Sequence, residues 1–320
     1  MTPFWSIMIP TFNCARSLRR TIESVLSATA HNSKTQIEIV DDVSRRDNPE
    51  EVADLYRKHG VAFFRQPMNI GASANFNSCI ARARGKWVHI LHGDDYVHPD
   101  FYSALEQSIS SHQNVRVAFT SYMAVDESGG LLWQPKNLPA AGGVIDPTWR
   151  DAIAIHNEIM APAIVVQKSA YTEAGNFNTS LCHTADWDMW KRLIWRYDTW
   201  FEPRALAYYV IHASSDSSKL MRSGENLRDS LRAIKIASQY FPIDRRKELF
   251  RKACRSHAGL GIATAKRFVK MSDYKGAFAQ LKASLFLDPG VIFDLAKSRF
   301  SDLWFPLGGA QQPPKNRKIL

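Results

Sequence analysis

Four short apolar runs rich in β-branched and aromatic residues alternate with helical patterns between residues 5 and 91. The runs cover residues 5–9, 36–40, 61–65 and 87–91, and the helical patterns between them cover residues 15–26, 50–58 and 72–84. Strands separated by single helices are typical of parallel sheets, because a parallel crossover needs a long connection and usually a helix. The sequence therefore predicts an α/β fold with a doubly wound, mostly parallel, Rossmann-like sheet.

The turn after the first predicted strand excludes two common nucleotide-binding motifs. A dinucleotide-binding fold carries Gly-x-Gly-x-x-Gly at this position, and a P-loop carries its own glycine-rich signature ending in Lys-Ser/Thr. This chain has Pro10, Thr11, Phe12 and Asn13 instead. Any nucleotide must therefore be held by a different arrangement.

The remaining elements divide the chain into two predicted regions and a tail. Residues 101–110, 168–174 and 186–195 are predicted helices, and residues 115–122, 163–166 and 207–211 are predicted strands. A turn-rich segment at residues 126–143 is expected to form a hairpin or a mobile loop. After Glu225 only helical patterns follow, at residues 226–240, 244–270 and 273–287, and they resemble a tetratricopeptide hairpin. We expect a catalytic domain at 1–222, a helical region at 223–305 and a disordered tail at 306–320.

Charge and cysteine usage limit the partners and the compartment. The chain of 320 residues has a formal net charge of +10, which favours polyanions such as acidic lipid headgroups or phosphorylated substrates. It has no recognisable nucleic-acid-binding motif, so no nucleic acid is expected. Its four cysteines are widely spaced, and neither a signal peptide nor a membrane-spanning run is apparent. We expect a cytoplasmic protein, with contact at the inner face of the plasma membrane as a further option.

Two adjacent carboxylates follow the fourth predicted strand. Gly93 ends the apolar run, and Asp94 and Asp95 come directly after it. Ligands of open α/β sheets bind outside the carboxyl ends of the strands, and neighbouring acids repel each other unless a cation or strong donors lie between them. This pattern predicts a site for a metal and a diphosphate. A turn whose acids cap the next helix is the alternative.

Several strand-end motifs together resemble the family 2 glycosyltransferases of the GT-A fold. The resemblance covers roughly residues 5–215, and its motifs are residues 6–13, 39–44, 69–71 with Asn75, 93–95 and 186–193. It implies an inverting enzyme with a nucleotide-diphosphate sugar donor, a UDP-sugar being favoured, and a divalent metal. The implied acceptor is a hydroxyl of a glycan or a lipid-linked sugar, as in the synthesis of cell-surface polysaccharide or glycolipid.

The resemblance also implies which residues hold the donor. Backbone groups at a turn can pair with a base edge, and a carboxylate can accept from a base N–H or from ribose hydroxyls. Core packing remains the alternative for Phe12 and a turn role for Asp42, while the adjacent Asp41 could do the same work. The implied nucleotide-sugar-binding residues are Pro10, Thr11, Phe12, Asn13, Asp42, Asn69, Gly71, Asn75 and Asp94.

The metal motif departs from the family pattern at two places. The family often has Asp-x-Asp followed by another acid, whereas His92 stands at the leading position here and is a doubtful ligand. Asp94 and Asp95 remain the candidate metal ligands, with Mn²⁺ or Mg²⁺ as the cofactor; Mn²⁺ tolerates histidine better. Val210 replaces an arginine that often precedes the family's histidine. His212 is a third candidate ligand, or else a strand-end histidine paired with backbone.

The predicted helix at residues 186–195 supplies the implied catalytic base. By resemblance Asp186 takes the acceptor proton, a contribution of roughly 10²–10⁴-fold. Asp188 lies about 200° further around the helix, so both acids cannot face one pocket; we expect Asp188 to be a cap or a surface residue, unless the two roles are exchanged. Trp187 and Trp190 are expected to wall the acceptor sugar, with core packing as the alternative.

Other readings of the same features stay open. The chain could be a nucleotidyltransferase, although it lacks a glycine-rich, basic loop after the first strand. It could instead be a scaffold with an inactive catalytic fold, which His92 and Val210 would favour. The basic excess, Trp304, Phe305 and the basic C-terminal end also suggest peripheral contact with an anionic membrane.

Overall fold

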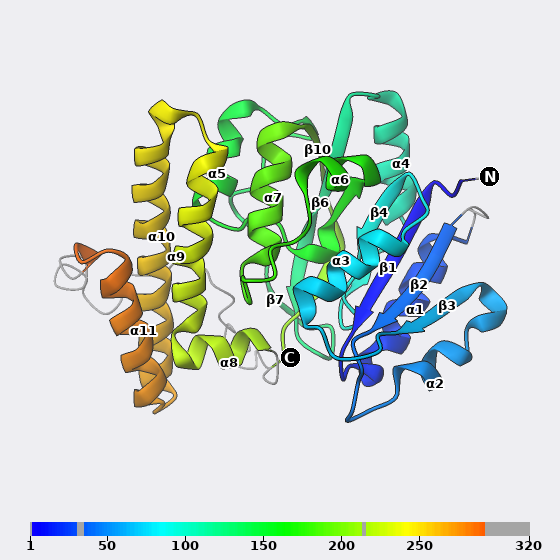
Figure 1. Ribbon diagram of the computed structural model, residues 1–320, viewed down its shortest axis with the longest axis horizontal. Helices are drawn as coiled ribbons and strands as arrows, with labels where there is room; N and C mark the ends of the chain where they lie inside the picture. The colour runs from blue at the N-terminus through cyan, green and yellow to red at the C-terminus, as the bar shows by residue number, and fades with distance from the viewer. Residues whose placement is uncertain (1, 31–34, 213–215, 292–320) are drawn as a thin grey trace, which may run out of the picture.

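The structure is a computed structural model that describes residues 2–30, 35–212 and 216–291. Within these residues a ten-stranded mixed sheet forms the centre of the molecule (Figure 1). Its strands are β1 (Trp5–Thr11), β2 (Thr35–Asp41), β3 (Val61–Arg65), β4 (Trp87–Ile90), β5 (Tyr96–Val97), β6 (Val115–Val125), β7 (Leu131–Trp133), β8 (Gly143–Val144), β9 (Ile164–Gln167) and β10 (Asp198–Val210).

The order of the strands confirms the predicted α/β class. The main path is β3-β2-β1-β4-β9-β6-β10-β5, with β3, β2, β1 and β4 parallel to one another and β6 parallel to β10. The short strand β9 runs antiparallel between β4 and β6. Because β1, β2 and β4 run in the same direction, their carboxyl ends and the polar turns that follow them lie at one edge of the sheet.

Two hydrophobic clusters cover the two faces of the sheet. Along β1, Ile7 and Ile9 point to one cluster and Met8 to the other, as the period of two in a strand requires. The first cluster is completed by α1 (Ala15–Ala28) and α4 (Phe101–Ser111), and the second by α3 (Ala72–Arg82) and α7 (Ala185–Arg196). In α1 the buried residues Leu18, Ile22 and Val25 recur at helical spacing and face the sheet.

The shorter helices are α2 (Pro49–Asp54), α5 (Arg150–Ile155) and α6 (Lys168–Ala174).

The segment at residues 126–143 contains β7, which pairs antiparallel with β6, so the predicted hairpin is present. The strand predicted at residues 207–211 is much longer, because β10 begins at Asp198 and passes Pro203 where the register with β6 shifts. Proline is tolerated in a strand at such an irregularity, and the sequence pattern alone gave no sign of it.

The helical region packs directly against the sheet domain. It consists of α8 (Asp216–Ser223), α9 (Glu225–Ala237), α10 (Ile243–Lys270) and α11 (Tyr274–Leu287), and α9 and α10 stand beside α7 and α5 (Figure 1). The cluster that contains Met8 and Val88 continues through α7 to Leu227 and Ala258, so the two regions share one core. The predicted boundary at 222/223 falls at the end of α8, and the predicted tail at 306–320 lies outside the described residues. No helix within the described residues is long and apolar enough to cross a membrane.

Candidate functional site

The turns after β1 and β2 are tied together by side chains. The Asn13 side-chain oxygen accepts from the backbone N–H groups of Arg45 and Arg46 at 2.8 and 2.9 Å, and the Asn13 backbone N–H donates to the Ser44 hydroxyl. Asn13 and Val43 both have positive φ angles, of 54° and 61°; for a β-branched residue this is a strained conformation. Strain of this kind persists where the surrounding bonds enforce it, and it often marks a functional site.

Phe12 is exposed to solvent at this edge of the sheet. Its side chain is 45% exposed, so the alternative of core packing is wrong. Thr11 is buried and its hydroxyl donates to the Asp41 carboxylate at 3.1 Å. An exposed aromatic ring beside a rigid backbone turn suits stacking on a flat base, which keeps Phe12 and the backbone of Pro10 and Thr11 as candidates for the nucleotide.

The two acids at the end of β2 are both buried, and both accept hydrogen bonds from other groups of the protein. Asp41 accepts from Thr11, from Ser44 and from Arg65, whose Nε lies at 2.8 Å. Asp42 accepts from the backbone N–H groups of Ile70 and Gly71 at 2.7 and 2.9 Å and from the Asn69 amide at 3.0 Å. Burial raises the pKa of Asp42, although these backbone donors oppose the shift. Asp42 thus shapes the turn that precedes α3.

Asn69 and Gly71 lie in that turn at the amino-terminal end of α3, where Gly71 has a φ of 84° and precedes the first helical residue. Asn75 lies one turn further and is only 2% exposed. Its amide donates to the Val40 carbonyl at 2.8 Å and its oxygen accepts from Gln66 at 3.0 Å. The structure therefore makes Asn75 a brace between β2 and α3, a correction to its expected place on the donor-binding surface.

Asp94 and Asp95 take different positions at the end of β4. The Asp95 side chain is 1% exposed and its Oδ1 accepts from the Val210 N–H at 2.8 Å. Asp94 is partly open, and its Oδ2 lies 2.9 Å from His212 Nε2. Burial and the charge of Asp94 raise the pKa of Asp95 well above its ordinary value. For Asp94 burial acts in the same direction, but His212 and His92 outweigh it and hold the pKa below its ordinary value.

One atom of this pair has no partner among the described residues. Asp95 Oδ2 is buried and accepts no hydrogen bond, and His92 Nδ1 lies 3.8 Å away. Ligand atoms of His92, Asp94 and Asp95 all lie within 4.8 Å of one another. The expected Asp94–Asp95 pair thus comes together with His92. A buried oxygen without a partner is costly, and a divalent cation would satisfy it. The three residues therefore fit a metal ion.

His92 is better placed than its departure from the family pattern suggests. Its ring stacks on Phe76 with centroids 5.1 Å apart, and burial lowers its pKa although Asp94 opposes the shift. A neutral imidazole is the form that binds a metal. Gly93 allows the close approach of this loop to β1, because a Cβ there would lie 2.7 Å from Cys14 Sγ and 2.9 Å from a Thr11 methyl group.

Asp186 lies in the first turn of α7 and is half-buried. Its carboxylate accepts from the Trp187 N–H at 2.7 Å and from the Asn157 amide at 3.1 Å. Burial raises the pKa of Asp186 to about 6, and the Trp187 and Asn157 donors oppose part of this shift. A carboxylate with a raised pKa near neutrality is suited to general-base catalysis.

Comparison with known proteins identifies this arrangement. Residues 6–158 match the family described as Glycosyl transferase family 2. The chain carries a family 2 glycosyltransferase domain. It is 25% identical over 191 residues to a chondroitin synthase of Escherichia coli, a match that covers 60% of this chain and 26% of that enzyme. The resemblance seen in the sequence is thereby confirmed.

Solved structures support the same fold for the glycosyltransferase domain. TarS of Staphylococcus aureus, residues 1–349, superposes with a TM-score of 0.58 at 13% identity, covering 87% of this chain and 90% of that one. A mannosyltransferase of Pyrobaculum calidifontis, in complex with GDP-Man and Mn²⁺, superposes with a TM-score of 0.56 at 13% identity, covering 92% and 81%. At this identity the likeness shows the fold alone. Asp186 and His212 lie beyond the residues matched to the family.

The two tryptophans of α7 do not line a surface that an acceptor sugar could reach. Trp187 and Trp190 are 1% and 2% exposed and belong to the core that joins the sheet to the helical region. Trp187 Nε1 donates to the Ile153 carbonyl at 2.6 Å, and its ring stacks on His257. The expectation fails because α7 is buried around most of its circumference, between the sheet and the helical region.

Asp188 is also buried, which corrects its assignment as a surface residue or a cap. It is 1% exposed and pairs with Arg192 at 3.1 Å, while the Tyr240 hydroxyl lies at 3.4 Å. The predicted rotation of about 200° from Asp186 turns it toward the helical region. A carboxylate held in this ion pair is not free to meet an acceptor, which disfavours an exchange of roles with Asp186.

Two further residues escaped the sequence analysis. Lys191 is fully buried, with Nζ 3.2 Å from the Ala233 carbonyl and 3.5 Å from the centre of the Trp187 ring. Burial lowers its pKa to about 7, although Asp188 and Asp186 oppose the shift. Tyr209 precedes Val210 on β10; burial raises its pKa, and the charges of Asp95, Asp94 and Asp186 add to the shift. The Tyr209 phenol therefore lies within electrostatic reach of both the candidate metal ligands and the candidate base.

Proposed function

We propose that this chain transfers a sugar, with inversion, from a nucleotide-diphosphate donor to an acceptor hydroxyl, assisted by a divalent cation. The observation that carries the proposal is the cluster of His92, Asp94 and Asp95, with the unpartnered Oδ2 of Asp95, whose two carboxylates act electrostatically on Tyr209. The charge of Asp186, on a different element, also acts on Tyr209, so a donor held by the first group can meet an acceptor activated by the second.

Each group has a distinct part in the proposed reaction. Phe12 and the turns at residues 10–13 and 69–71 hold the base and ribose, with Asp42 fixing the second turn. A cation bound by Asp94, Asp95 and His92 would offset charge on the leaving diphosphate. His212 holds Asp94 in place at 2.9 Å or becomes a further ligand. Asp186 accepts the proton of the acceptor hydroxyl as that oxygen attacks the anomeric carbon from the face opposite the diphosphate.

The relatives support the donor class and a polysaccharide product. TarS has been solved in complex with UDP and with UDP-GlcNAc, and the Pyrobaculum enzyme with GDP-Man and Mn²⁺. A chondroitin synthase and a hyaluronan synthase are among the matching proteins. We therefore favour a UDP-sugar donor, Mn²⁺ or Mg²⁺, and a glycan or lipid-linked acceptor in polysaccharide or cell-envelope glycolipid synthesis.

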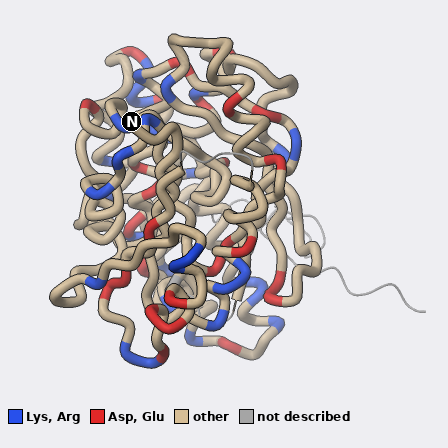
Figure 2. The backbone as a smooth tube through the Cα atoms, turned by 90° about the vertical axis from the view of Figure 1, so that its right-hand side faces the viewer, with Lys and Arg blue, Asp and Glu red and all other residues tan. Residues whose placement is uncertain are grey.

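We propose that the protein contacts an anionic membrane on its cytoplasmic side, where the acceptor would lie. The outer face of α11 exposes Tyr274, Phe278 and Phe286, at 67%, 69% and 73%. The exposed residues Lys275 and Lys282 lie on the same helix, which contains no acidic residue. Exposed aromatic rings with flanking lysines suit the headgroup layer of an anionic bilayer. In the backbone view of Figure 2, positions occupied by Lys or Arg and positions occupied by Asp or Glu are interspersed along the chain.

The test is release of free nucleotide from a set of UDP- and GDP-sugars, with Mn²⁺, Mg²⁺ or EDTA. We expect release by the wild type with one donor and a cation, and strong loss in Asp95→Asn. A protein that neither binds nor cleaves any donor with either metal would instead be an inactive scaffold. Release of pyrophosphate from a nucleoside triphosphate and a sugar phosphate would instead identify a nucleotidyltransferase.

A further inference from the structure

The loop that leads into α7 is held between the nucleotide end of the site and the helical region. On one side, the Ser73 hydroxyl of α3 donates to the Leu181 carbonyl at 3.1 Å, and Asn77 exchanges two hydrogen bonds with the backbone of Phe177. On the other side, the loop meets α9. The loop ends at Thr184, two residues before Asp186.

A single carboxylate from α9 receives most of the polar groups at the end of this loop. Asp229 Oδ2 accepts from the backbone N–H groups of His183 and Thr184 at 2.8 and 2.9 Å and from the Thr184 hydroxyl at 2.8 Å. Its Oδ1 accepts from the Cys182 N–H at 3.3 Å and pairs with Arg232 at 2.8 Å. Asp229 is 0% exposed, so these protein donors replace water at the carboxylate.

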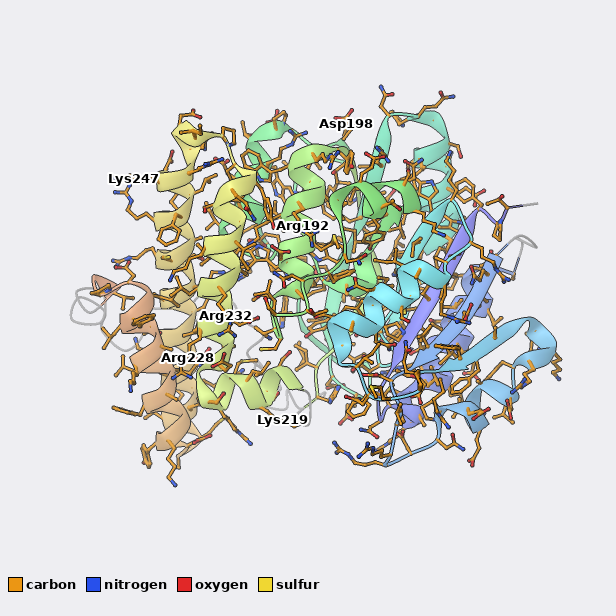
Figure 3. All side chains as sticks on the ribbon, in the orientation of Figure 1. Arg192, Asp198, Lys219, Arg228, Arg232 and Lys247 are labelled. Atoms are coloured by element: carbon orange, nitrogen blue, oxygen red, sulfur yellow. The ribbon has the colours of Figure 1, made fainter. Side chains whose placement is uncertain are left out.

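The charge of Asp229 is compatible with its burial. Burial alone would raise the pKa of Asp229, but the donors at His183, Arg232 and Thr184 outweigh it and hold the pKa below its ordinary value. Arg232, labelled on α9 in Figure 3, is half-exposed and keeps the pair in contact with solvent. Asp229 is therefore a carboxylate that binds the loop as a fixed anchor.

This arrangement differs from an ordinary helix cap. Thr184 stands at the N-cap position of α7, but its side chain makes no capping bond to its own helix and turns to Asp229 instead. The carboxylate of Asp186 accepts from the Trp187 N–H within the first turn. The start of α7 is thus fixed by one acid of its own and by one acid from another region of the chain.

We propose that Asp229 is a positioning residue that sets the location of Asp186, so that the helical region is part of the active site. The proposal rests on the proposed function, because it assigns Asp186 as the base. Asp229 touches neither donor nor acceptor; it acts through residues 182–184. A displacement of the base by about 1 Å can cost about 10²-fold in rate, whereas binding of the donor at β1 and β4 is left intact.

The test compares Asp229→Asn with Asp273→Asn in the full chain. Asp273 is a matched control, because its side chain accepts from the Gly276 N–H at 3.0 Å at the start of α11 and also pairs with an arginine, Arg222, at 3.5 Å. Both variants remove the charge of an aspartate and its ion pair within the helical region, while the amide that replaces the carboxylate keeps one acceptor oxygen. We expect the melting temperature to fall more for the buried Asp229→Asn than for Asp273→Asn, and kcat to fall by about 10- to 100-fold for Asp229→Asn alone.

The Michaelis constants separate positioning from general damage. For Asp229→Asn the KM of the donor should stay within about twofold of the wild type, because base displacement affects a step after donor binding. Equal kcat values in the two variants, or an increase in donor KM that accounts for the loss, would overturn the proposal. If Asp229→Asn does not fold, Thr184→Val decides, since it removes only the 2.8 Å hydroxyl donor and should lower kcat several-fold with unchanged KM.

Asp186→Asn distinguishes this proposal from the one on which it rests. If Asp186→Asn keeps wild-type kcat, the assignment of the base has failed. If Asp186→Asn is inactive while Asp229→Asn and Thr184→Val behave as the wild type, the base is correct and only the anchoring role of Asp229 has failed.

Discussion

The two carboxylate centres of the site are built in different ways. Asp94 and Asp95 are neighbours in sequence and are completed by His92 before them and by β10, which supplies the Val210 N–H and His212. Asp186 depends on segments that are far apart in the chain, namely Asn157, α7 and, through the preceding loop, α9. The acids of the first centre adjoin in one strand-end motif, whereas we propose that the second centre depends on the helical region.

The largest effect is expected at Asp186. Replacement by Asn removes the proposed base while keeping its size and its hydrogen bond to the Trp187 N–H. We expect kcat to fall by about 10³-fold with little change in donor KM, measured by nucleotide release. Asp188→Asn is the control: it should lower the melting temperature by breaking the pair with Arg192, while kcat stays within about tenfold. The opposite pattern would mean that the two acids exchange roles.

The next effect is expected at the local centre. Asp95→Asn should lower nucleotide release by about 10²-fold or more and abolish the stabilisation of the protein by Mn²⁺ and donor together, because a ligand raises stability only through binding to the native state. Thermal unfolding with and without MnCl₂ measures the second effect. Unchanged metal-dependent stabilisation would place the cation elsewhere.

The pH dependence of kcat reports the ionisation of Asp186 and the effect of the buried Lys191 on it. With a pKa of about 6, Asp186 should be protonated and inactive below that pH, so the acidic limb of kcat should lie near pH 6. Lys191 favours the ionised form of Asp186 from within the core. Its removal in Lys191→Met should therefore move the limb to higher pH, with less than about a tenfold loss at pH 8. A limb that does not move would exclude electrostatic coupling between the two residues.

The smallest effect on catalysis is expected at α11. Phe278→Glu and Phe286→Glu should leave nucleotide release unchanged but reduce co-sedimentation with vesicles of anionic phosphatidylglycerol. Ile243→Glu is the matched control, because Ile243 is 81% exposed at the start of α10 and away from the aromatic face. If the wild type does not bind these vesicles and instead forms a dimer that Phe278→Glu dissociates, the aromatic face of α11 binds a second copy of the chain.

The same division explains what the sequence could predict. The strands, and the acids that follow β2 and β4, are local signals, because apolar runs and their end residues adjoin in the chain. The hydrogen bond from the Val210 N–H to Asp95 Oδ1 joins residues more than a hundred positions apart, and neither motif predicts that contact. Trp187 and Trp190 were misplaced because the pattern gives a face of a helix, not what covers it. The second covered side of α7 carries the buried Asp188 and Lys191, so hydrophobicity gave no sign of it.

The rate of nucleotide release, measured for the wild type, Asp95→Asn and Asp186→Asn, tests the central claim most directly. The wild type should release nucleotide from a UDP- or GDP-sugar only with a cation, Asp95→Asn should lose the dependence on the cation together with most of the rate, and Asp186→Asn should bind donor and cation normally but turn over at least about 10²-fold more slowly. Release by the wild type that is insensitive to EDTA, or an Asp186→Asn variant as fast as the wild type, would contradict the account.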